Sequence, residues 1–79
     1  KEHTRLNTRV KKLETLINEI ELQIETNNEL LTSPDLASDY AKLSEVTAAI
    51  ETLEQKLLDT MSEWEQTTQK LETISQELI

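Results

Sequence analysis

The stretch Leu31-Thr32-Ser33-Pro34-Asp35 interrupts an otherwise continuous helical pattern and decides the fold of this 79-residue chain. Pro34 lacks a backbone N–H and disfavours helical geometry at the residue before it, so a helix that reaches this stretch should end there. Ser33 is a suitable N-cap for a short turn whose first residue is Pro34, and Asp35 follows near the positive end of that turn. The chain therefore divides here into two helical segments.

The helical segments on the two sides of this break are long and unequal. We expect a first helix over about residues 3–31, a turn over residues 32–38 and a second helix over about residues 39–79. Ser38 is the expected N-cap of the second helix, with Asp39 in its first turn. Because the connection is short, the two helices should be antiparallel neighbours.

Apolar residues recur at alternating steps of three and four along both segments. A sustained period of this kind predicts a coiled-coil seam. The polar residue Asn27 falls in the frame, either as a register device or because it lies near the turn. The expected fold is therefore all-α, a two-helix antiparallel coiled-coil hairpin. The apolar frame consists of Leu6, Val10, Leu13, Ile17, Ile20, Ile24 and Leu31 in the first helix, and Leu36, Leu43, Val46, Ile50, Leu53, Leu57, Trp64, Leu71, Ile74 and Leu78 in the second, where Thr60 and Thr67 fall in the same frame.

The register of the hairpin follows from matching seam positions across antiparallel helices. The pairing that we favour brings Arg9 close to Glu63, and a slip of one heptad would also match seam positions. In the favoured pairing the last apolar residues of the chain have no partner, so we expect a weak homodimer or fraying at that end. The favoured pairs are Leu6 with Trp64, Leu13 with Leu57, Ile20 with Ile50 and Asn27 with Leu43, and the unpartnered residues are Leu71, Ile74 and Leu78.

The composition excludes several classes of site. The chain has no glycine, which removes the phosphate loops and calcium loops that depend on a glycine backbone, and it has no cysteine for a disulfide, a thiol nucleophile or zinc. His3, the single histidine, lies in the first turn without positioned partners. We therefore expect no catalytic residue, no metal site and no cofactor. The absence of a long apolar stretch argues against a membrane span, and a cytoplasmic origin fits best.

The charge is unevenly distributed along the chain. The formal net charge is −8, yet residues 1–12 carry net +4, which leaves −12 on the remainder. Arg5, Arg9 and Lys12 lie on one flank of the first helix and are the candidates for contacting nucleic-acid phosphates. The alternative is that these cations are solvated or paired within the hairpin. Trp64 could stack on a base, but its place in the seam favours a core role with its ring on Leu6 and its indole N–H at the rim.

Two motifs connect the chain to a known family. Residues 31–43, LTSPDLASDYAKL, and residues 57–65, LLDTMSEWE, resemble the C-terminal coiled-coil domain of ABC-F ATP-binding cassette proteins. In that family a helical hairpin has a turn with proline and aspartate, a Ser-Asp-Tyr restart and a late Trp-Glu pair. The resemblance implies a non-catalytic C-terminal domain of a cytoplasmic ATPase, with two nucleotide-binding domains upstream as partners.

The same resemblance implies a partner outside the ATPase. Members of the family act on ribosomes, and in some of them the C-terminal domain is associated with nucleic-acid contact. The expected function is therefore an interaction module that contacts the ribosome or nucleic acid. The alternative is a structural coiled coil that scaffolds another protein or self-associates. Loss of ribosome or RNA binding on removal of residues 1–79 would separate the two.

Overall fold

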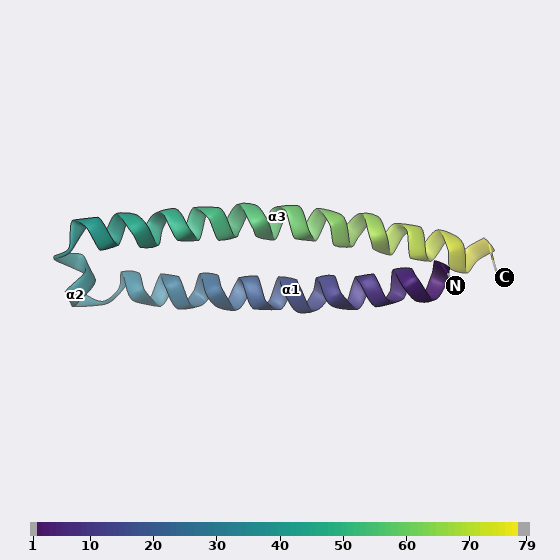
Figure 1. Cartoon of the computed structure of the whole chain (residues 1–79), viewed down its shortest axis with the longest axis horizontal. Helices are drawn as coiled ribbons and strands as arrows, with labels where there is room; N and C mark the ends of the chain where they lie inside the picture. Colours follow the sequence, from purple (N-terminus) through teal and green to yellow (C-terminus); the bar gives the residue numbers. More distant parts are fainter. Residues whose placement is uncertain (1, 78–79) are drawn as a thin grey trace.

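The computed structural model describes residues 2–77 and contains three helices. Helix α1 spans Glu2–Leu31, the short helix α2 spans Pro34–Ala37, and helix α3 spans Tyr40–Glu77. Helices α1 and α3 run antiparallel, with α2 at the closed end (Figure 1). The described part of the chain contains no strand, so the predicted all-α hairpin is confirmed. The predicted helix continued to residue 79, and its last two residues lie outside the described range.

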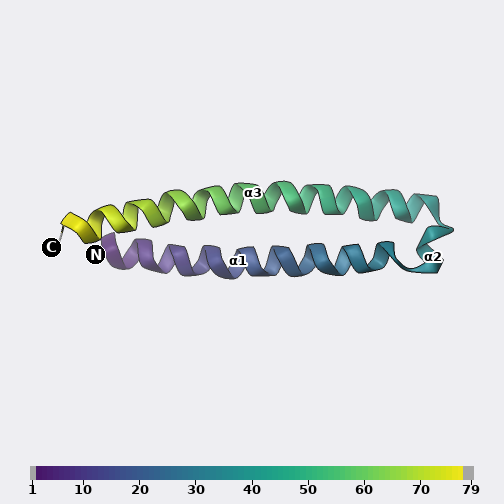
Figure 2. The same ribbon diagram turned by 180° about the vertical axis from the view of Figure 1, so that it is seen from behind.

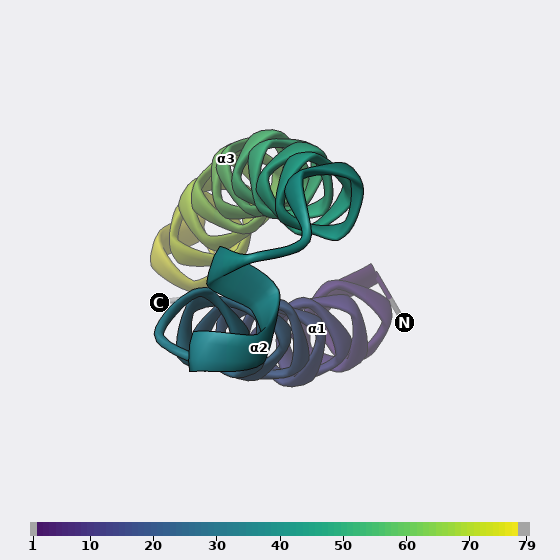
Figure 3. The ribbon, with the colours of Figure 1, turned by 90° about the vertical axis from the view of Figure 1, so that its left-hand side faces the viewer.

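The hairpin is a thin rod with principal extents of 61 × 14 × 14 Å. The two long helices stay side by side along the length of α1, as Figures 1 and 2 show from opposite sides. Viewed end-on, they wind gradually around each other (Figure 3), as a heptad seam requires to keep its apolar strip buried. A rod of this width has one line of buried side chains and no second layer.

The closed end is built from capping interactions without any residue at positive φ in the described range. Ser33 has extended geometry and occupies the N-cap position of α2, as predicted, and its carbonyl accepts the N–H groups of Leu36 and Ala37 at 3.2 Å. Its hydroxyl makes no capping hydrogen bond. Pro34 follows at the first helical position, where its missing N–H costs nothing.

The N-cap of α3 is Asp39, which corrects the prediction of Ser38. The backbone N–H of Lys42 donates to Asp39 Oδ1 at 3.2 Å, three residues into the helix. The Ser38 hydroxyl instead donates to the carbonyl of Asp35 at 3.0 Å and closes the turn behind it. A carboxylate at this position also faces the positive end of the helix dipole, which a serine hydroxyl cannot match.

The seam residues lie along the line where α1 meets α3. Leu13 and Ile20 are each 1% exposed, and Ile50 is buried as well. The predicted seam residues Leu6, Ile17, Ile24, Leu53, Leu57 and Trp64 are half-buried. The polar residues Thr60 and Thr67 also reach the core, where each hydroxyl donates at 2.7 Å to the carbonyl four residues earlier in α3. The seam is therefore apolar with two internally satisfied threonine positions.

The favoured pairing of Leu6 with Trp64 is wrong. The indole Nε1 of Trp64 donates to Glu14 at 3.3 Å, which places Trp64 about two turns further along α1. Leu57 likewise lines a groove with Ile24 and Glu21, instead of facing Leu13. These contacts correspond to the slip of about one heptad that also matches seam positions. Hydrophobic periodicity repeats with the heptad, so it does not distinguish the two registers.

The slip also changes the end of the hairpin. Leu71 and Ile74 are half-buried, and Ile74 lines a groove together with Glu2 at the start of α1. The expectation that these two residues lack a partner within the chain is therefore wrong, because α1 reaches further along α3 than the favoured pairing allows. Leu78, the third residue of that expectation, lies outside the described residues.

Candidate nucleic-acid interface

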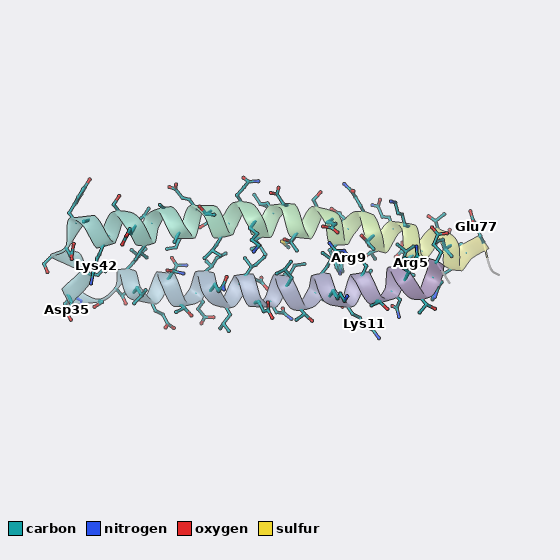
Figure 4. The ribbon with its side chains drawn as sticks, viewed as in Figure 1. Arg5, Arg9, Lys11, Asp35, Lys42 and Glu77 are labelled. Atoms are coloured by element: carbon teal, nitrogen blue, oxygen red, sulfur yellow. The ribbon has the colours of Figure 1, made fainter. Side chains whose placement is uncertain are left out.

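The three candidate cations lie in the first third of α1, near the open end of the hairpin. Arg5, Arg9 and Lys12 are spaced by four and three residues, which places them on one flank of the helix, and all three are exposed. In Figure 4, Arg5 and Arg9 lie toward α3, whereas Lys11 extends away from it. The structure therefore brings the predicted residues to one side of the rod and leaves the neighbouring Lys11 on another.

Arg9 is held by α3. Its Nε donates to Oε2 of Glu63 at 2.8 Å, and its Nη2 contacts the same oxygen, so the guanidinium grips one carboxylate oxygen with two nitrogens. Both side chains are about half exposed, at 50% and 47%. The predicted proximity of Arg9 and Glu63 is confirmed, and the pair fixes the direction of the arginine while leaving it accessible from the solvent.

Arg5 and Lys12 have no such partner within residues 2–77. Neither side chain forms a hydrogen bond or an ion pair there. They flank Arg9 along the helix, so a ligand that meets this side of α1 encounters two cations without a carboxylate partner and one that is already neutralised. This arrangement can bind phosphate oxygens by charge. Lys12 also lines a shallow hollow of about 310 Å³ with Thr8, Lys11 and Thr15.

Trp64 belongs to the seam. Its ring is half-buried between the helices, and its N–H reaches Glu14 at the rim on α1. The predicted core role, with the indole nitrogen at the rim, agrees with this placement, although the ring does not lie on Leu6. A tryptophan held by a cross-helix hydrogen bond is not free to stack on a base.

The single histidine and the carboxylates are the other side chains that could hold a metal ion. His3 is exposed in the first turn, and no group of three histidine, cysteine, aspartate or glutamate side chains within residues 2–77 is placed to hold a metal ion. No helix in this part of the chain is both long enough and apolar enough to cross a membrane. The exposed flank of α1 thus remains the candidate site.

One feature of the surface lies beyond the sequence predictions. A groove of about 590 Å³ runs beside α1 near the closed end. A heptad pattern treats every seam layer as filled and therefore does not predict a groove. The sequence does indicate an acidic surface here, since residues 13–41 contain no lysine, arginine or histidine.

The comparison with protein families gives a match over residues 1–69, to the model described as the ABC transporter C-terminal domain. That range covers α1, the closed end and most of α3. Neither the search of curated proteins nor the search of solved structures found a match. The matched range is far more than half of the chain and includes both motifs of the resemblance. The chain belongs to the ABC transporter C-terminal domain family, the coiled-coil C-terminal domain found in ABC-F proteins.

Proposed function

We propose that this C-terminal domain of an ABC ATPase contacts nucleic acid, as ribosomal RNA or in another form, through the exposed flank of Arg5, Arg9 and Lys12. The domain is an accessory part of the ATPase and is not itself catalytic. The observation that carries the proposal is the position of these three cations on one accessible side of α1, in a chain whose other residues are strongly acidic.

The physical basis of this contact is electrostatic. Cations that neutralise phosphates release condensed counterions, so the affinity falls as salt rises. Arg5 and Lys12 lack carboxylate partners and supply most of this attraction, whereas Arg9 must share its guanidinium with Glu63. The acidic remainder of the chain repels phosphate, so the contact is confined to the start of α1. We expect salt-sensitive binding that orients the domain and does not read sequence.

The test uses the ABC ATPase that carries this chain, with ribosomes in a sedimentation assay and a labelled RNA duplex in an anisotropy assay. The double variant Arg5→Glu/Lys12→Glu should weaken both interactions and lower the slope of log affinity against log salt by about 2. The control Lys42→Glu/Lys56→Glu changes the net charge equally on α3 and should have little effect.

The outcome distinguishes nucleic-acid contact from a purely structural role. Equal losses in the two double variants would assign the effect to overall charge and contradict the proposed site. Unchanged binding in both double variants would mean that this flank does not contact nucleic acid. The scaffold or self-association role would then remain.

A further inference from the structure

The groove near the closed end is shallow and combines apolar with polar side chains. Its apolar side chains are Ile24 of α1 and Leu57 of α3, which are both half-buried. Its polar side chains all come from α1. The groove has a volume of about 590 Å³, and its lining residues are Glu21, Ile24, Glu25, Asn28, Glu29, Thr32 and Leu57.

A polar residue occupies the seam position one helical turn from Ile24. Asn27 occupies a seam position, but its Nδ2 donates to the carbonyl of Gln23 at 2.8 Å within α1. Its side chain therefore forms a hydrogen bond within its own helix. Within residues 2–77, Asn27 donates no hydrogen bond to α3 that would support a role in setting the register. The apolar surface that stays open to a ligand is that of Ile24 and Leu57, which are both half-buried.

The wall of the groove has a regular row of negative charge. Glu21, Glu25 and Glu29 repeat every four residues on one face of α1, over about 12 Å of helix. All three are exposed, and within residues 2–77 none of them forms an ion pair. The labelled cations of α1 lie in the other half of the rod (Figure 4). The groove thus combines apolar side chains with carboxylates that form no ion pair within residues 2–77, although Lys56 of α3 adjoins Leu57.

We propose that this groove binds a basic amphipathic helix of a partner protein. A helix laid along α1 presents lysine or arginine side chains four residues apart, which matches the spacing of the three glutamates. An apolar side chain on the same face would cover Ile24 and Leu57. Nucleic acid is the wrong ligand here, because its phosphates would meet three carboxylates. This surface is separate from the flank of Arg5 and Lys12, so the two contacts are independent.

The experiment measures the binding of a fluorescein-labelled synthetic amphipathic helix of lysine and leucine to the 79-residue chain by anisotropy. Glu21→Gln/Glu25→Gln/Glu29→Gln removes the charge and keeps the shape of the wall. Glu45→Gln/Glu65→Gln/Glu72→Gln removes the same charge from exposed positions of α3 that do not line the groove. Circular dichroism of each variant verifies that the hairpin is intact.

The groove variant should bind about tenfold more weakly than the native chain, while the control variant should stay within about twofold. A second variant, Asn28→Arg, places a cation in the groove without touching the seam, and it should weaken binding to a similar extent. Equal weakening by groove and control variants would overturn the proposal, as would a native chain that does not bind the peptide. Tighter binding of the native chain to a labelled RNA duplex through this face would also overturn it.

Discussion

The indole N–H of Trp64 donates to the carboxylate of Glu14 across the hairpin, with Nε1 and Oε2 3.3 Å apart. This contact fixes the register, because the alternative pairing would place Trp64 about two helical turns away, next to Leu6. Glu14 and Trp64 both lie within residues 1–69, the range that matches the family model.

The register can be read from the fluorescence of this single tryptophan. The chain has no cysteine, so one nitroxide label can be attached at a cysteine introduced at Glu14 or at Asn7. The label at position 14 should quench Trp64 more strongly than the label at position 7. Stronger quenching from position 7 would restore the pairing of Trp64 with Leu6. A loss of quenching in samples diluted with unlabelled Trp64→Phe chain, which adds no tryptophan signal, would show contact between chains instead.

The burial of Ile20 predicts a large cost for its truncation. Ile20 is 1% exposed, whereas Leu22, two residues away on the same helix, is 63% exposed. Ile20→Ala should lower the free energy of unfolding by about 2–4 kcal/mol, and Leu22→Ala by less than about 0.5 kcal/mol. Urea denaturation followed by circular dichroism measures both. Similar values for the two variants would mean that the apolar strip of α1 faces another direction.

The cap of α3 gives a second matched pair. Asp39→Ala removes the acceptor of the Lys42 N–H and should cost about 1 kcal/mol. Ser38→Ala should cost less, because its hydroxyl bonds to a carbonyl in the turn and leaves the N–H groups of α3 unaffected. Thermal unfolding ranks the two variants. If Ser38→Ala lowers the melting temperature more than Asp39→Ala does, Ser38 is the N-cap and α3 starts one residue earlier, as the sequence alone predicts.

The buried threonines offer a route to a more stable hairpin. The Thr60 hydroxyl is buried in the seam and bonds only to the carbonyl of Lys56, which keeps its helical N–H partner when the hydroxyl is removed. Thr60→Val should therefore raise the free energy of unfolding by about 1 kcal/mol. The exposed Thr15 makes the same bond to Lys11, so Thr15→Val is the control and should change little. A destabilised Thr60→Val would show that the hydroxyl has a role in the seam.

The Arg9–Glu63 pair should contribute little to stability because both side chains are half exposed. A double-mutant cycle with Arg9→Ala and Glu63→Ala should give a coupling of about 0.2–1 kcal/mol that decreases with added salt. Glu63→Gln should also free Arg9 and strengthen RNA binding at low salt. Weaker RNA binding of this variant would mean that Glu63 orients Arg9 productively.

The sequence predicted the architecture well, because proline chemistry and the heptad period act locally. Pro34 ends one helix and begins a short one for reasons contained in its ring. The register could not be predicted in this way, since a shift of seven residues satisfies a heptad pattern equally well. Only side-chain contacts such as that of Trp64 with Glu14 distinguish the alternatives.

The candidate site was predictable to a similar extent. Helical spacing was enough to place Arg5, Arg9 and Lys12 on one flank, and the approach of Glu63 to Arg9 was foreseen. A heptad pattern does not predict the groove, because the groove depends on how the side chains beside the seam pack in three dimensions. The role of Asn27 is also not fixed by the pattern, since its side chain could have bridged to α3 but bonds to its own helix instead.

The separation of charge along a 61 Å rod gives the domain a large electric dipole moment. The positive charge at the start of α1 is offset by glutamates of α3 at the same open end, whereas the closed half of the rod carries the net negative charge. Near a polyanion such a rod experiences a torque that turns its open end toward the source of the field before any contact forms. The rate of association should therefore depend on orientation as well as on net charge, so a chain that is acidic overall can still approach a negatively charged surface with its less acidic open end first.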